Sequence, residues 1–215
     1  MQKIFEELTD QEVKIFQSFN SPRKIQDFLE TIPINFEKGG ETCYSPRKVL
    51  ENNKAHCFEG ALFAAAALMF HREKPLLLDL VSAHNDYDHV VALFRDRGCW
   101  GAISKTNHGV LRYREPIYKN IREIALSYFH EYFLDSGQKT LRTFSKPFNL
   151  SRFNSQGWVT ARKDLWYLVE ALDNSPHQTI LNKSQIRKLR PADPIEIKIG
   201  KVIEWIPGKK SYKFK

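Results

Sequence analysis

The chain has 215 residues, a formal net charge of +8, and 42% hydrophobic residues, which predicts one packed domain over residues 1–215 and excludes a disordered chain. No apolar run reaches the ~20 residues that a helix needs to cross a bilayer. The acidic, amphipathic start of the chain is unlike a secretory signal, so we expect a cytoplasmic protein.

The charged residues and the cysteines indicate neither a nucleic-acid interface nor a metal site. Basic residues are scattered and become dense only at 187–190 and 209–215, which predicts a solvated basic surface with a basic tail. Cys43, Cys57 and Cys99 are odd in number and contain no close pair, as expected for reduced thiols. Because their spacing matches no zinc motif, we expect no cofactor.

The first part of the chain, residues 1–44, reads as a helical extension. Thr9 is a candidate N-cap for a helix over 10–19, with Glu12 at the capping-box position. Ser21-Pro22 starts a second helix, because proline suits the first helical position.

The segment that follows predicts the centre of the fold. Ser45-Pro46 repeats the start signal ahead of a short helix over 47–51. Residues 55–70 are apolar on nearly every side of a helix, so this helix should be buried.

A change to short apolar runs then indicates strands. Residues 76–81, 89–94 and 99–104 have the pattern of strands. The polar residues 95–98 form a plausible hairpin turn between the last two.

The remaining residues predict further helices and one late strand. Helices followed by an antiparallel sheet and more helices indicate an α+β fold. We expect its core over about 45–135 and a C-terminal appendage of helix and strand over 150–215. The expected elements are a helix from 115 to about 134, a loop over 147–157, a helix capped by Thr160 that runs to 172, a short helix over 184–189 and a strand over 195–205.

The predicted hairpin brings two side chains together. If Phe94 and Cys99 flank the turn, His89 lies opposite Ser104 and both side chains point to the same face. A slip of one residue would separate them. Ser104 is then the best-placed residue to orient the imidazole of His89, and Asn107 is the alternative if the chain bends back.

Cys57 is the candidate nucleophile. It opens the buried helix, where the helix N-terminus lowers the pKa of a thiol, and the imidazole of His89 can take its proton. The backbone N–H of Cys57 is the natural donor to an oxyanion. Asn52 is the candidate for a second donor, while Asn53 is better explained as a helix cap.

Residues 45–107 resemble the core of the transglutaminase-like superfamily, within the papain-like cysteine enzymes. That family places a cysteine at the start of a central buried helix and a histidine at the start of a strand. A third residue, usually aspartate, lies on the next strand, often four positions after a tryptophan. Cys57, His89 and Trp100-Gly101-Ala102-Ile103-Ser104 follow this layout, with serine in place of aspartate and Val90-Val91 where an aromatic residue is common.

A weaker similarity links the chain to the related arylamine N-acetyltransferases. It rests on Cys57-Phe58-Glu59. The Arg-Gly-Gly lead-in of those enzymes is replaced here by Asn53-Lys54-Ala55.

The resemblance implies acyl transfer through a thioester on Cys57, with His89 as general base and Ser104 or Asn107 orienting the ring. The substrate would be an amide of a peptide or protein. Water as acceptor would make the chain a hydrolase, and an amine would make it a transferase. The alternative is an inactive module of the same fold that binds an acidic or peptide partner, which the serine at position 104 and the basic charge both favour.

Overall fold

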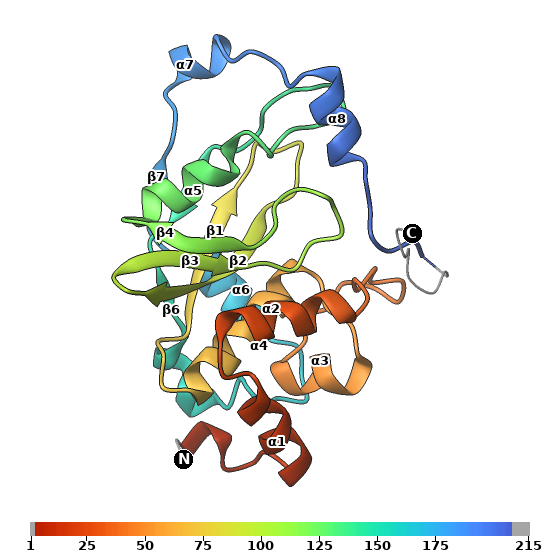
Figure 1. The fold of residues 1–215 in the computed structure, drawn as a ribbon, viewed down its shortest axis with the longest axis vertical. Coiled ribbons are helices and arrows are strands. Elements are labelled where there is room, and N and C mark those ends of the chain that lie inside the picture. The colour runs from red at the N-terminus through yellow and green to blue at the C-terminus, as the bar shows by residue number, and fades with distance from the viewer. Residues whose placement is uncertain (1–2, 208–215) are drawn as a thin grey trace.

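A seven-stranded antiparallel sheet with helices on both faces forms the centre of the computed structural model, which describes residues 3–207 (Figure 1). The fold class is α+β, as predicted. The basic tail over 209–215 lies outside the described residues. Within 3–207, no helix combines the length and the apolar character that crossing a membrane requires.

The N-terminal helices begin where the sequence predicts. Thr9, Ser21 and Ser45 each accept a backbone N–H of the first turn on the side-chain oxygen, which satisfies an otherwise unpaired donor. These three helices are α1 (Asp10–Ser18), α2 (Pro22–Thr31) and α3 (Pro46–Asn52), preceded by the short η1 (Lys3–Phe5).

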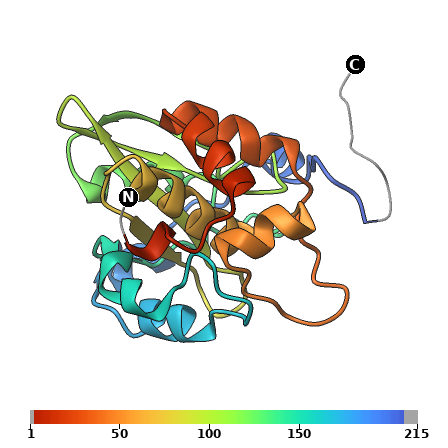
Figure 2. The same cartoon turned by 90° about the horizontal axis from the view of Figure 1, so that it is seen from below.

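The central helix α4 (Cys57–Phe70) is surrounded on all sides. Every residue from Phe58 to Met69 is buried, as the apolar sequence predicts. Helices α1 to α3 pack around it together with the cyan segment after residue 150, which lies across the molecule from α2 (Figure 2). The cap of α4 is His56, and Asn53 instead ends α3 with a left-handed φ of 48°.

The sheet has the strand order β4-β3-β2-β1-β5-β7, and β6 also pairs with β1. One face packs on α4, and the other packs on α5 (Ile121–Phe129). The strands are β1 (Leu76–Val81), β2 (His89–Asp96), β3 (Cys99–Ile103), β4 (Arg114–Tyr118), β5 (Thr143–Ser145), β6 (Phe148–Asn149) and β7 (His177–Thr179).

The register of the β2–β3 hairpin differs by two residues from the predicted one. Strand β2 continues to Asp96, which pairs with Cys99. The turn is therefore Arg97-Gly98 alone, with φ values of 46° and 84° that suit a type I′ turn. Because side chains alternate with a period of two, this even offset leaves His89 and Ser104 on the same face.

Two later predictions were wrong in the type of element. Residues 114–118 form strand β4, and the helix that was expected from 115 begins only at α5 (Ile121–Phe129), where Asn120 caps its first turn. The expected strand over 195–205 begins as helix α8 (Pro194–Gly200), because Asp193 and Glu196 form a capping box and Pro194 occupies the first helical position.

The other C-terminal elements differ mainly in their bounds. Thr160 caps no helix, since its hydroxyl donates to Glu7, and α6 (Trp166–Asp173) begins after Leu165. The predicted loop contains β6 and the 3-10 helix η2 (Leu150–Gln156), and the short helix is α7 (Lys183–Arg187).

Candidate active site

Cys57 and His89 meet at one cavity of about 860 Å³ beside the first turn of α4. Cys57 is partly exposed, and the imidazole of His56 lines the same cavity. Helix α4 supplies the thiol and strand β2 supplies the second imidazole, so the fold brings together the two residues that the sequence singled out.

A hydrogen bond to Ser104 sets the tautomer of His89. The Nε2 atom of His89 lies 2.8 Å from Oγ of Ser104. The single hydroxyl proton of Ser104 is donated to the carbonyl oxygen of Leu111 at 2.6 Å, so Ser104 must accept the N–H of His89. The proton of neutral His89 is therefore on Nε2, which leaves Nδ1 with a lone pair for the thiol.

The carbonyl that fixes Ser104 belongs to a strained residue. Leu111 has a φ of 60°, a left-handed conformation that is unfavourable for a residue with a side chain. Its N–H donates to the carboxylate of Glu131 at 2.7 Å, and Glu131 also pairs with Arg114 at 2.7 Å. Leu111 is thus held at both of its polar backbone groups.

The backbone of Ser104 is fixed by helix α2. The amide side chain of Gln26 accepts the N–H of Ser104 at 2.9 Å and donates to its carbonyl at 2.8 Å. Both groups are buried, so these bonds resist competition from water. They hold the end of β3 at a constant position relative to α2.

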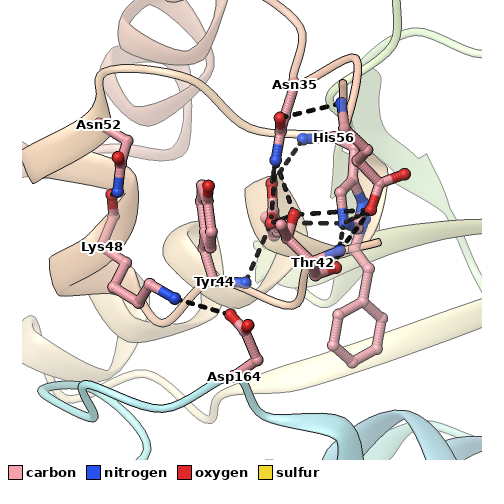
Figure 3. Close-up of polar contacts among 10 residues, drawn as sticks. Asn35, Thr42, Tyr44, Lys48, Asn52, His56 and Asp164 are labelled. Atoms are coloured by element: carbon pink, nitrogen blue, oxygen red, sulfur yellow. Dashed lines mark hydrogen bonds and ion pairs between the residues drawn. The ribbon is translucent and has the colours of Figure 1, made fainter. Parts of the chain in front are cut away.

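His56 is a second imidazole at the thiol of Cys57. The sequence pattern predicted no role for it. Its Nε2 atom donates to the carbonyl of Thr42 at 3.0 Å, and its Nδ1 atom accepts the N–H of Phe58 at 3.3 Å. The loop that carries Thr42 folds back over the start of α4 to make this contact (Figure 3).

Glu59 holds that loop and His56 together. Its carboxylate is fully buried and accepts hydrogen bonds from four groups of the surrounding chain. These donors are the side chains of Asn35 and Thr42 and the backbone N–H groups of Tyr44 and His56, at 2.7 to 3.1 Å (Figure 3). These four hydrogen bonds compensate the burial of the carboxylate and tie the loop to the first turn of α4.

The two imidazoles make Cys57 an acidic thiol. Burial alone would raise its pKa, but hydrogen bonds and charge interactions with His56 and His89 lower the pKa to about 5. Burial would lower the pKa of His56, yet the neighbouring Cys57 and Glu59 raise that pKa to about 9. Cys43, by contrast, is fully buried, no imidazole is among the groups that shift its pKa, and burial raises the pKa of its thiol to about 12.

Two of the expected site residues have other partners. Asn107 lines the cavity, but its side chain donates to the carbonyl of Trp205 at 3.0 Å and accepts the N–H of Trp205 at 2.7 Å, so Ser104 is the partner of His89. Asn52 is exposed on α3 and donates back to the carbonyl of Lys48 at 2.8 Å, well apart from His56 (Figure 3). The assignment of Asn52 as an oxyanion donor was wrong, because its side-chain amide donates to a backbone carbonyl of its own helix.

The backbone N–H of Cys57 is the donor that this arrangement leaves at the start of α4. Within residues 3–207, hydrogen bonds are made by the N–H groups of Phe58 and Gly60 in the same turn, but none is made by that of Cys57. A helix N-terminus also favours negative charge on a nearby oxygen. Side chains of the described residues form no cluster that could hold a metal ion.

No family model matches the chain, and a search of the curated proteins finds no match.

Proposed function

We propose that this chain is a cysteine-dependent acyl-transfer enzyme with a transglutaminase-like core. The observation that carries the proposal is that the thiol of Cys57 and the imidazoles of His56 and His89 meet at one cavity. A buried structural cysteine has a raised pKa, as Cys43 does, so the lowered pKa at Cys57 favours a nucleophile.

The proposed reaction begins with attack by the thiolate of Cys57 on a carbonyl carbon. The C–S bond forms, and the electron pair of the C=O bond moves to oxygen, where the N–H of Cys57 can donate to it. Collapse breaks the bond to the leaving amine, which takes a proton from an imidazolium beside the sulfur and leaves a thioester. Nδ1 of His89 then takes a proton from water or an acceptor amine, whose attack breaks the C–S bond and restores the thiolate.

The walls of the cavity support a substrate with an apolar acyl group. Apolar side chains from four separate segments line it, and Tyr87, a residue that is 91% exposed, also lies at the cavity. Burial of an apolar acyl group against such walls would supply binding energy and position the carbonyl at Cys57. The apolar wall residues are Ile34, Phe36, Val110, Leu111, Phe133, Leu134 and Ile197.

The test uses p-nitrophenyl acetate as an activated acyl donor. We expect release of nitrophenolate and a single acetyl group on the peptide that contains Cys57, detected by mass spectrometry after acid quench. Cys57→Ala should abolish acetylation of this peptide. His89→Ala should slow hydrolysis of the acetyl thioester on Cys57. Peptide amides with apolar side chains are then the second class of substrate to assay.

The same experiment contains an internal control, Cys99, and an outcome that would contradict the proposal. Cys99 is a partly exposed thiol on β3 of the same protein, so its acetylation reports ordinary thiol reactivity. If Cys57 and Cys99 acetylate at equal rates and no hydrolysis follows, the chain is not an enzyme of this class. That result would instead favour the inactive binding module.

A further inference from the structure

His56 has the surroundings of a charged imidazole. We propose that His56, and not His89, carries the positive charge opposite the Cys57 thiolate in the resting protein; this inference rests on the proposed function. His56 would store the thiol proton, and His89 would stay neutral as the base. The groups that face each imidazole favour this assignment of the positive charge to His56 and of the neutral base to His89.

Three oxygen atoms, one from a carbonyl and two from carboxylates, lie near Nε2 of His56. The carbonyl oxygen of Thr42 lies at 3.0 Å, and the carboxylate oxygens of Glu59 and Glu37 lie at 3.4 and 3.8 Å. A carbonyl accepts hydrogen bonds and cannot donate, so Nε2 carries a proton whichever charge the ring has. Two carboxylates at this range favour the ring that is protonated on both nitrogens.

His89 lacks such surroundings. Its Nε2 proton is bound by a neutral hydroxyl, that of Ser104, and the side chain is buried. Among residues 3–207, histidine pairs with carboxylates at His56 and at His177, but not at His89. No carboxylate of the described residues therefore faces His89 as Glu59 and Glu37 face His56.

The proton transfer balances within the site. The proton leaves Sγ of Cys57 and binds Nδ1 of His56, which gives a thiolate and an imidazolium. Nδ1 then donates to the sulfur and no longer accepts the N–H of Phe58, which is released at the N-terminus of α4 beside the thiolate. The groups that set this equilibrium are Glu59 and Glu37 near His56, and His89, which also interacts with the sulfur of Cys57.

The cap position of His56 permits a sharp test. Asparagine and serine are good N-caps, so His56→Asn and His56→Ser keep the start of α4 while they remove the imidazole. His89→Ala is the matched variant for the other ring. Alkylation of Cys57 by iodoacetamide is followed across pH by mass spectrometry of its peptide, with Cys99 as the internal reference and circular dichroism as the check of folding.

The readout is the pH of half-maximal alkylation, because the intrinsic reactivity of a thiolate also changes with its pKa and distorts rates at a single pH. We expect both His56 variants to raise this midpoint by at least about two pH units, toward the ordinary value of about 8.5, and His89→Ala to shift it by less than about one. His56→Asn should regain acyl transfer at high pH, whereas His89→Ala should not.

Two results separate the hypotheses. If the wild-type midpoint lies low and His89→Ala raises it as much as His56→Asn, the charge resides on His89 and the inference is wrong, while the proposed function stands. If the wild-type Cys57 titrates like Cys99, the thiol is ordinary and the proposed function itself fails.

Discussion

Lys105 gives the stability of this protein a pH dependence that can be worked out from its surroundings. The side chain is 1% exposed, and its ammonium donates to the carbonyls of Leu29 and Ile32 at 2.8 and 2.7 Å, at the end of α2. Burial lowers its pKa to about 8 from the ordinary 10.5, even though the charges of Glu30 and Glu204 act in the opposite direction.

The sign of the effect follows from proton binding. Between about pH 8 and 10.5, Lys105 is protonated in the unfolded chain and neutral in the folded one, so the free energy of unfolding rises with pH. At about 1.4 kcal/mol for each pH unit, the rise amounts to about 3 kcal/mol. Below pH 8 both states bind the proton, and the penalty of the buried charge is constant.

The assay is urea unfolding of the wild type and of Lys105→Met, from about pH 7 to about pH 11. Methionine keeps an unbranched apolar chain but has no charge. Tyr128 and Cys43, whose pKa values burial raises, titrate in both proteins and cancel in the difference. We expect the wild type to gain about 3 kcal/mol relative to the variant across this range. A difference that does not change with pH would refute the reasoning.

Three further predictions concern packing, the site and the sheet. Gly60→Ala places a Cβ 2.4 Å from Cβ of Lys105, so calorimetry should show that the free energy of unfolding falls by about 1–3 kcal/mol. Gly39→Ala is the control, because a Cβ there meets no atom within 4 Å and should change this free energy little. Ser104→Ala removes the acceptor that orients the imidazole of His89. If His89 is the proposed base, kcat for ester hydrolysis should fall about a hundredfold with KM nearly unchanged, and an unchanged kcat would rule out this role. Asp79 is a buried carboxylate whose pKa is raised by burial and by a neighbouring carboxylate, so wild-type stability should fall as pH rises above about 4, and Asp79→Asn should lack that fall in urea unfolding.

The parts of the fold that the sequence predicts well depend on local signals. Thr9, Ser21 and Ser45 are caps that act on the next few residues, and an all-apolar helix has few alternatives to burial. The contact between His89 and Ser104 was predicted from a register that was wrong by two residues. It is nevertheless present, because an even offset preserves the face of each side chain.

The parts that were not predicted depend on distant contacts or on competing local signals. Histidine is not a usual N-cap, so the sequence pointed to Asn53 as the cap, and the role of His56 follows only once the loop with Thr42 folds back. In residues 194–200, isoleucine at every second position resembles a strand. The capping box of Asp193 was the signal that could have identified α8.

The serine at position 104 first favoured an inactive protein, because a hydroxyl brings no charge to stabilise an imidazolium. That argument assumes a single imidazole at the thiol. Here a second imidazole, that of His56, faces the carboxylates of Glu59 and Glu37, which can stabilise the charge there. His89 then needs only a neutral partner that fixes its tautomer, which is what Ser104 provides. Under this division of roles, Ser104→Asp in the His56→Asn background should favour positive charge on His89, so the pH of half-maximal alkylation of Cys57 by iodoacetamide should fall relative to His56→Asn alone.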